Sequence, residues 1–99
     1  MPRSLNAERE LADAREALAA GALDRARDAA WRAAASAAQI GDTAALEEVV
    51  EIVSTLAGSK VDDVERLQTY AAACLEDARA GTRPPSAFER LIKRDLRPR

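Results

Sequence analysis

The feature that most constrains the fold is an alanine-rich stretch, residues 23–40, in which apolar residues recur every three or four positions. Its regularly spaced apolar residues are Leu23, Ala26, Ala30, Ala33, Ala37 and Ile40. Because an α-helix turns once in 3.6 residues, this spacing places them on one helical face. Such small side chains let neighbouring helices approach to an interaxial distance of about 8 Å. We therefore predict a helix over 23–40 at the centre of a close-packed domain.

Four other segments have helical spacing of their apolar residues, and the spacing predicts helices over 5–20, 43–57, 60–80 and 87–97. Alanine, the strongest helix former, accounts for 24 of the 99 residues, and no segment alternates in the manner of a strand. Ser59 and Asp62 have the spacing of a capping box, which predicts the start of the fourth helix. A glycine follows each of the first four helices: Gly21, Gly41, Gly58 and Gly81.

The links between the first helices are short, and short links favour antiparallel packing of neighbours. The predicted fold class is therefore all-α, with four antiparallel helices forming two αα hairpins, as a bundle or a short solenoid, and a short C-terminal helix. We place the domain boundary after Gly81. Residues 1–81 form the hairpin domain, and residues 82–99 form a proline-containing linker and a short basic amphipathic helix.

A shift of 38 positions superposes the apolar residues of the first hairpin on those of the second, and only Ala30, which meets Gln68, breaks the match. The superposed pairs are Leu11 with Val49, Ala14 with Ile52, Leu18 with Leu56, Leu23 with Val61, Ala26 with Val64, Ala33 with Ala71, Ala37 with Leu75 and Ile40 with Ala78. The pattern is typical of a repeated helical hairpin. Alanine-rich hairpins also match in part by chance, so both explanations stay open.

Residues 7–38 resemble a tetratricopeptide repeat, through Ala14, Ala17, Gly21, Leu23, Ala26, Ala30 and Ala33. The resemblance implies a helical module that binds peptides or partner helices in a concave groove. The sequence departs from that family in four respects. Glu10 replaces an aromatic residue, Ala14 replaces a glycine, the closing proline is absent, and the offset of 38 exceeds the family's repeat of about 34 residues. No groove residue is therefore carried over.

Residues 11–38 are also similar, more weakly, to the helical HEPN nucleotide-binding and RNase domains. The nuclease motif of that family requires an arginine and a histidine four residues apart, and this chain has no histidine. The resemblance therefore implies an inactive or regulatory member. The lack of histidine also excludes Ser-His-Asp catalysis and histidine-containing zinc sites. We expect no enzymatic activity, no cofactor and no metal site.

Three groups of side chains invite a functional interpretation, but each is better explained by structure. The acidic residues Glu47, Glu48, Glu51, Asp62 and Asp63 lack the spacing of a calcium loop and are interpreted as a solvated surface. Cys74 has apolar neighbours at helical spacing, which favours a buried structural thiol over a reactive one. Trp31 and Tyr70 are interpreted as core or core-edge packing rather than as the lining of a ligand pocket.

The C-terminal segment carries the best candidate for function. Residues 79–99 contain seven basic and two acidic residues, a net charge of +5, so the first 78 residues carry −7 of the total −2. The candidate partner-binding residues are Phe88, Arg90, Leu91, Ile92, Lys93, Arg94, Leu96 and Arg97. They combine an apolar and a basic face. Such a helix caps its own bundle, docks in a partner's groove, or contacts an anionic surface.

The sequence therefore predicts a non-enzymatic protein–protein interaction or adaptor module, whose partner is another protein or a second copy of the chain. The alternative is a small regulatory protein that contacts nucleic acid through its basic C-terminal segment. Nucleic acid is the less favoured partner because no aromatic residues interleave the basic stretch. No secretory signal and no long apolar run is present, which predicts a cytoplasmic protein without membrane contact. The preference for arginine over lysine, 13 to 2, is typical of GC-rich bacterial genomes.

Overall fold

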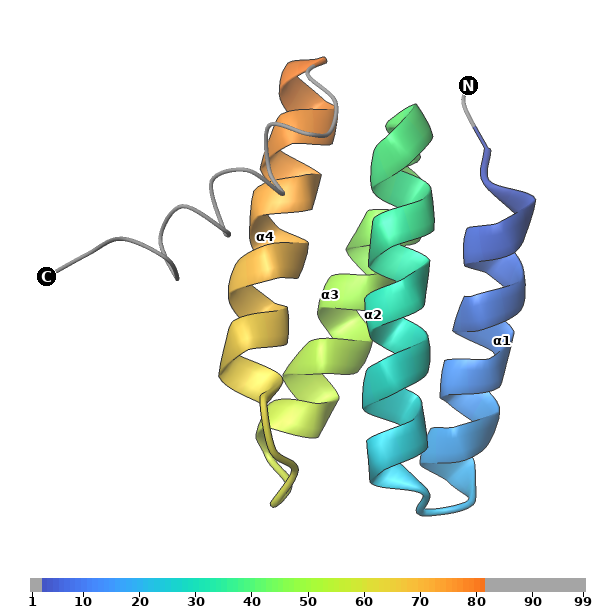
Figure 1. Cartoon of the computed structure of the whole chain (residues 1–99), viewed down its shortest axis with the longest axis vertical. Helices are drawn as coiled ribbons and strands as arrows, with labels where there is room; N and C mark the ends of the chain where they lie inside the picture. The colour runs from blue at the N-terminus through green and yellow to red at the C-terminus, as the bar shows by residue number, and fades with distance from the viewer. Residues whose placement is uncertain (1–2, 82–99) are drawn as a thin grey trace, which may run out of the picture.

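The computed structural model describes residues 3–81, which fold into four α-helices with no strand in that range (Figure 1). The helices are α1 (Leu5–Ala19), α2 (Leu23–Ile40), α3 (Thr43–Ala57) and α4 (Val64–Ala80). The all-α prediction is thus confirmed for the described part of the chain. The predicted linker and C-terminal helix of 82–99 lie outside the described residues.

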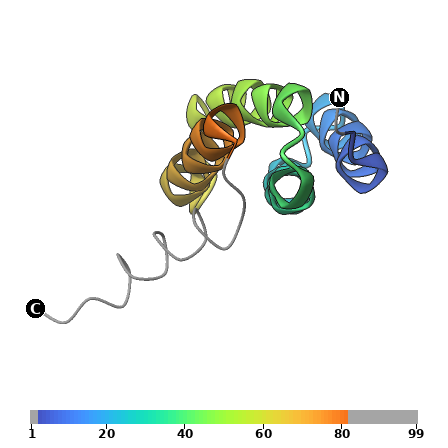
Figure 2. The same ribbon diagram turned by 90° about the horizontal axis from the view of Figure 1, so that it is seen from above.

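The four helices are packed so that α2 and α3 lie between α1 and α4 (Figures 1 and 2). Each helix runs in the opposite direction to the one before it (Figure 1). Both α2 and α3 contact all three other helices, whereas α1 and α4 do not contact each other. The two outer helices therefore each have one side turned away from the other three.

A single carboxylate joins the N-termini of α1 and α3. Oδ1 of Asp42 accepts a hydrogen bond from the Ala45 backbone N–H at 3.1 Å, which caps α3. Oδ2 of Asp42 accepts a second hydrogen bond from the Ser4 backbone N–H at 2.8 Å, just before α1. The Ser4 hydroxyl in turn caps α1 by accepting from the Ala7 N–H at 3.1 Å. Both capping residues are buried, and the 38 positions between them equal the offset found in the sequence.

The ends of α1 and α2 have the same backbone conformation. Gly21 and Gly41 both adopt a left-handed φ, at +74° and +71°. The residue after each glycine donates its N–H back into the helix, from Ala22 to the Ala17 carbonyl at 2.8 Å and from Asp42 to the Ala37 carbonyl at 2.9 Å. This is the Schellman arrangement, in which glycine avoids the steric cost that a Cβ would add. The turn after α2 thereby places Asp42 at the N-cap position of α3.

The predicted start of the fourth helix after Ser59 is wrong, because α4 begins at Val64. The Val61 N–H donates to the Ser59 carbonyl at 3.1 Å, which closes a tight turn, and Asp63 adopts a left-handed φ of +61°. Arg27 of α2 donates from Nη1 to the Asp62 carbonyl at 3.0 Å. These contacts hold 59–63 in a turn, where Val61 packs against the core. The capping-box spacing is therefore coincidental.

The alanine stripe of α2 is buried as predicted at its four alanines, whereas Leu23 and Ile40 at its ends are only partly buried. Burial extends beyond the predicted face, because α2 contacts three helices. The fully or almost fully buried alanines of α2 are Ala26, Ala29, Ala30, Ala33, Ala34, Ala37 and Ala38. The largest fully buried side chains come from the other helices: Leu11, Leu46, Leu56, Leu67, Val49, Val53 and Cys74. The small side chains of α2 thus make room for the large ones of its neighbours.

Candidate functional site

The predicted partner-binding residues lie in the part of the chain outside the described residues: Phe88, Arg90, Leu91, Ile92, Lys93, Arg94, Leu96 and Arg97. The basic region that begins at Arg79 is therefore described only at its first residue. Arg79 lies 3.8 Å from a carboxylate oxygen of Glu47 on α3. The candidate site is accordingly sought on the surface of 3–81.

The aromatic pair links α2 to α4. The rings of Trp31 and Tyr70 are stacked, with centroids 5.5 Å apart and planes at 9° to each other. Tyr70 is 5% exposed, and the partly buried Trp31 packs against the core. Stacked aromatic pairs contribute stability beyond the area that they bury. The interpretation of these residues as core and core-edge packing is confirmed.

Cys74 lies one turn beyond Tyr70 on α4 and is 1% exposed. Burial raises the pKa of the Cys74 thiol from 9.0 to about 11, with the nearby Asp77 carboxylate adding to the rise and the Tyr70 hydrogen bond opposing it. Burial likewise raises the pKa of Tyr70. The thiol is protonated and inaccessible at neutral pH, so the prediction of a buried structural thiol is confirmed.

The raised pKa of Cys74 makes the stability of the protein depend on pH. The thiol of the unfolded chain ionises near pH 9, whereas the folded thiol holds its proton to about pH 11. Stability from this group is therefore complete below pH 9 and is lost as the pH rises toward 11. Thermal unfolding from pH 7.5 to 10.5 is expected to show a steeper loss in the native chain than in Cys74→Ala. Parallel curves for the two proteins would contradict this expectation.

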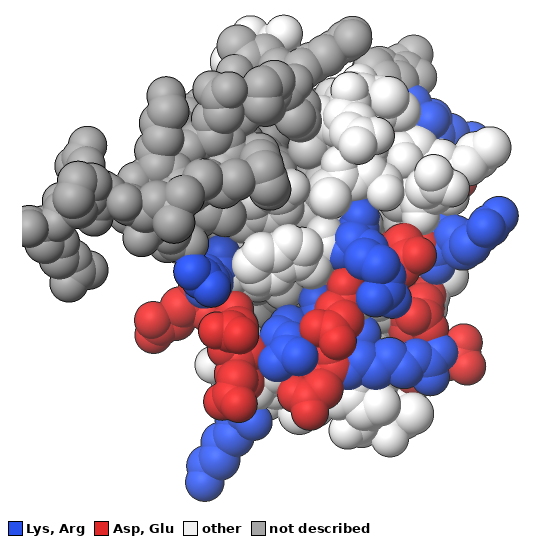
Figure 3. All heavy atoms as spheres, in the orientation of Figure 1, with Lys and Arg blue, Asp and Glu red and all other residues white. Residues whose placement is uncertain are grey.

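Several charged side chains on the surface form ion pairs with side chains of a neighbouring helix. On the face shown in Figure 3, acidic and basic side chains lie interspersed. Arg25 pairs with Asp13, and Arg32 lies 2.7 Å from Glu10, so α2 is tied to α1. The spacing of Asp28 and Arg32 suggests a pair within α2, but this expectation is wrong because Arg32 reaches across to α1.

Acidic residues of α3 also form ion pairs with neighbouring helices. Glu48 pairs with Arg15 of α1, and Glu47 pairs with Arg79 of α4. Within 3–81, no three carboxylate or thiol side chains gather closely enough to hold a metal ion. The other two aspartates of the predicted acidic surface, Asp62 and Asp63, are not on α3. They lie on the turn between α3 and α4, at the edge of a cleft.

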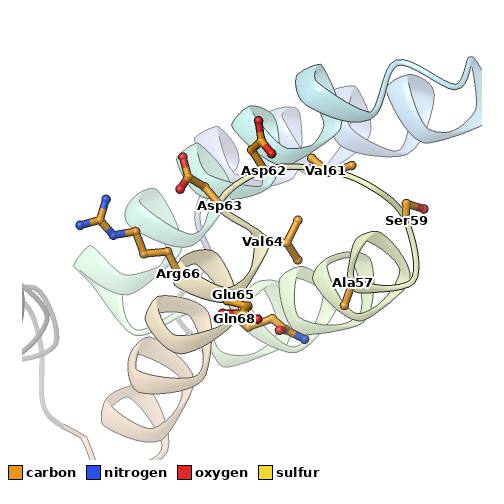
Figure 4. A pocket seen from close by; sticks show the side chains of 9 residues that line it. All are labelled: Ala57, Ser59, Val61, Asp62, Asp63, Val64, Glu65, Arg66 and Gln68. Atoms are coloured by element: carbon orange, nitrogen blue, oxygen red, sulfur yellow. The ribbon is translucent and has the colours of Figure 1, made fainter.

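This turn bounds a cleft of about 590 Å³ between the end of α3 and the start of α4 (Figure 4). Val64 is buried and Val61 is partly buried, and both contribute apolar surface to the cleft. Asp62, Asp63 and Glu65 are exposed at its edge. In Figure 4 the carboxylates of Asp62 and Asp63 point away from the loop toward the same side. The complete lining is Ala57, Ser59, Val61, Asp62, Asp63, Val64, Glu65, Arg66 and Gln68.

The cleft is held in place by Arg27 of α2. Its guanidinium donates to the Asp62 carbonyl and also lies 3.5 Å from Asp24 and 3.1 Å from Asp28. The cleft is not predicted from the sequence, because the capping-box spacing predicts a helix over residues 60–63. A signal was present, since aspartate tolerates the left-handed conformation better than most residues, and two aspartates in succession favour a turn.

A smaller hollow of about 250 Å³ lies at the shared N-termini of α1 and α3. Asp42 lines it, but both carboxylate oxygens of Asp42 already accept backbone hydrogen bonds. None of the four described helices is both long and apolar enough to cross a membrane. Comparison of the chain with protein-family models, curated proteins and solved structures finds no match.

Proposed function

We propose that the chain is a non-enzymatic protein–protein interaction module, an adaptor built from two stacked αα hairpins of tetratricopeptide-like type. Two observations support this architecture. Consecutive helices alternate in direction, and Asp42 ties the starts of α1 and α3 together at the 38-residue offset. Stacked hairpins expose extended surfaces that suit the binding of a partner chain.

The observation that carries the proposal is the cleft at the turn between α3 and α4. It combines apolar surface from Val61 and Val64 with exposed carboxylates at its edge. Sites of this kind bind segments that bring both apolar side chains and positive charge. Residues 82–99 have this composition, with four large apolar residues and six basic ones. We therefore propose that the cleft binds a basic amphipathic segment, from another protein or from the C-terminus of a second copy.

Calorimetric titration of the full chain with a synthetic peptide of residues 82–99 tests the proposal. Binding is expected at about 20 mM salt and is expected to weaken strongly at about 300 mM, because salt screens exposed charges. The double variant Asp62→Asn, Asp63→Asn is expected to bind at least about tenfold more weakly, because it loses two attractive charges. The control Glu51→Gln, Glu76→Gln removes two exposed carboxylates elsewhere and is expected to bind like the native chain.

Equal weakening in both double variants, or no binding at low salt, would refute the cleft as the binding site.

A parallel titration with duplex DNA and duplex RNA addresses the alternative function. Duplex binding at low salt that is lost on replacing Arg90, Lys93, Arg94 and Arg97 by glutamine would favour a nucleic-acid protein instead. Under the proposal, neither duplex binds more tightly than the peptide.

A further inference from the structure

The outer face of α1 is an unpartnered helix face on the described part of the chain. α1 packs on α2 and α3 through Ala7, Leu11, Ala14 and Ala17, and it has no contact with α4. On the opposite side of the helix, exposed residues recur at steps of four and three. They are Leu5, Arg9, Ala12, Glu16 and Ala19. This set is called the α1 outer stripe below.

Leu5 is the apolar residue at the N-terminal end of the α1 outer stripe. It is 72% exposed and is the one large apolar side chain exposed in the described part of the chain. Farther along the stripe, the small side chains of Ala12 and Ala19 allow another helix to approach closely. A single exposed leucine is normal on a protein surface, so the charges of the stripe, rather than Leu5, point to a partner.

The charges of α1 provide the indication that the α1 outer stripe has a partner. Four other charged residues of the helix have ion-pair partners: Glu8 with Arg3, Glu10 with Arg32, Asp13 with Arg25 and Arg15 with Glu48. Arg9 and Glu16 form no ion pair with any residue of the described part. Glu16 contributes only a weak attraction to Arg25, whose raised pKa comes mainly from its ion pair with Asp13. They stand seven residues apart on the α1 outer stripe and have opposite charges.

The order of residues along the stripe determines which partner fits. Read from its N-terminal end it is Leu, Arg, Ala, Glu, Ala at spacings of four, three, four and three. A second stripe in the antiparallel direction sets Ala12 against Ala12, Arg9 against Glu16 and Leu5 against Ala19. Each pairing then occurs twice about a two-fold axis, as an isologous interface requires. A parallel arrangement would instead set Arg9 against Arg9 and Glu16 against Glu16.

We propose that the α1 outer stripe is a self-association surface, through which two copies of the chain pair antiparallel, with two reciprocal Arg9–Glu16 ion pairs about a central Ala12 contact. The helix is 15 residues long, about 22 Å, so one helix face against another buries less than about 1,200 Å² in total. Interfaces of this size are transient. The dimer therefore forms at high protein concentration and exchanges with monomer.

Sedimentation equilibrium of the full chain up to about 1 mM, the concentration range that suits a weak interface, tests the proposal. Arg9→Glu and Glu16→Arg are each expected to weaken the dimer by about tenfold or more, because each turns two attractive pairs into two repulsive ones. The double variant Arg9→Glu, Glu16→Arg is expected to dimerise like the native chain, because it exchanges the charges without changing their complementarity. Restoration in the double variant distinguishes direct pairing from a general effect of charge.

Matched controls are Glu51→Arg and Lys60→Glu, which reverse exposed charges elsewhere and are expected to leave the dimer unchanged. A native chain that is monomeric at about 1 mM, or single variants that weaken a dimer without restoration in the double variant, would overturn the proposal. So would a dimer that none of these variants affects.

A second measurement locates the two-fold axis. Under oxidising conditions, Ala12→Cys in a Cys74→Ser background is expected to form a covalent dimer, whereas Ala57→Cys in that background is not. Equal cross-linking of both would contradict the proposed interface.

The α1 outer stripe is separate from the cleft at the α3–α4 turn. Loss of peptide binding in the Asp62 and Asp63 variant therefore leaves dimerisation intact, and the two proposals can fail independently.

Discussion

Replacing Asp42 by alanine is expected to lower the free energy of unfolding by about 2–4 kcal/mol, from loss of a helix cap and from a second N–H left without its acceptor. The carboxylate is 4% exposed and accepts from both the Ala45 and the Ser4 backbone N–H groups. In the alanine variant both donors lose the acceptor that they have in the native chain. Chemical denaturation followed by far-UV circular dichroism measures the loss.

Two further variants separate the contributions of the two oxygens. Asp42→Asn keeps one carbonyl oxygen to cap α3 but presents an amide N–H₂ in place of the oxygen that accepts from Ser4. It is therefore expected to lose about half as much as Asp42→Ala. Ser4→Ala removes only the hydroxyl cap of Ala7 and is expected to cost about 1 kcal/mol. If Asp42→Ala costs no more than Ser4→Ala, the carboxylate does not hold the two helices together.

Enlarging an alanine at the centre of α2 is expected to have the second large effect. Ala30 and Ala33 are fully buried in a helix that contacts all three others. A leucine at either position has no space to occupy, so the neighbouring helices must move apart, at a cost of about 1–3 kcal/mol. Thermal unfolding of Ala30→Leu and Ala33→Leu measures this cost.

Ala72→Leu is the control, because Ala72 is exposed on α4 and the added side chain extends into solvent. Its melting temperature is expected to stay close to that of the native chain. If both buried variants also keep the native melting temperature, α2 is not closely packed at its centre. A loss in only one of them would instead show that the close approach is confined to one neighbour of α2.

The helices could be predicted from sequence wherever spacing, caps and glycines agree. The bounds of α2 and α3 follow directly from the alanine stripe, from Asp42 as a cap and from the left-handed Gly41. The start of α4 could not be predicted in this way. There the spacing of Ser59 and Asp62 satisfies a local rule, but the Arg27 contact from another helix and the burial of Val61 determine the conformation.

The two proposed binding surfaces were harder to predict than the helices, because they depend on contacts between residues far apart in sequence. The cleft exists only because residues 59–63 turn instead of continuing a helix. The α1 outer stripe depends on which charges of that helix form ion pairs with other residues, and these pairs are set by the fold. The i, i+4 spacing predicts an ion pair between Asp28 and Arg32, whereas in the structure Arg32 pairs with Glu10 and Asp13.

The stacking of Trp31 on Tyr70 gives the chain an intrinsic optical probe. Trp31 is the only tryptophan, and the ring beneath it belongs to the other half of the domain. Its fluorescence therefore reports the separation of α4 from α2, while circular dichroism reports the helices themselves. Stopped-flow traces recorded with both signals would show whether the halves dock as the helices form or only afterwards, without any added dye.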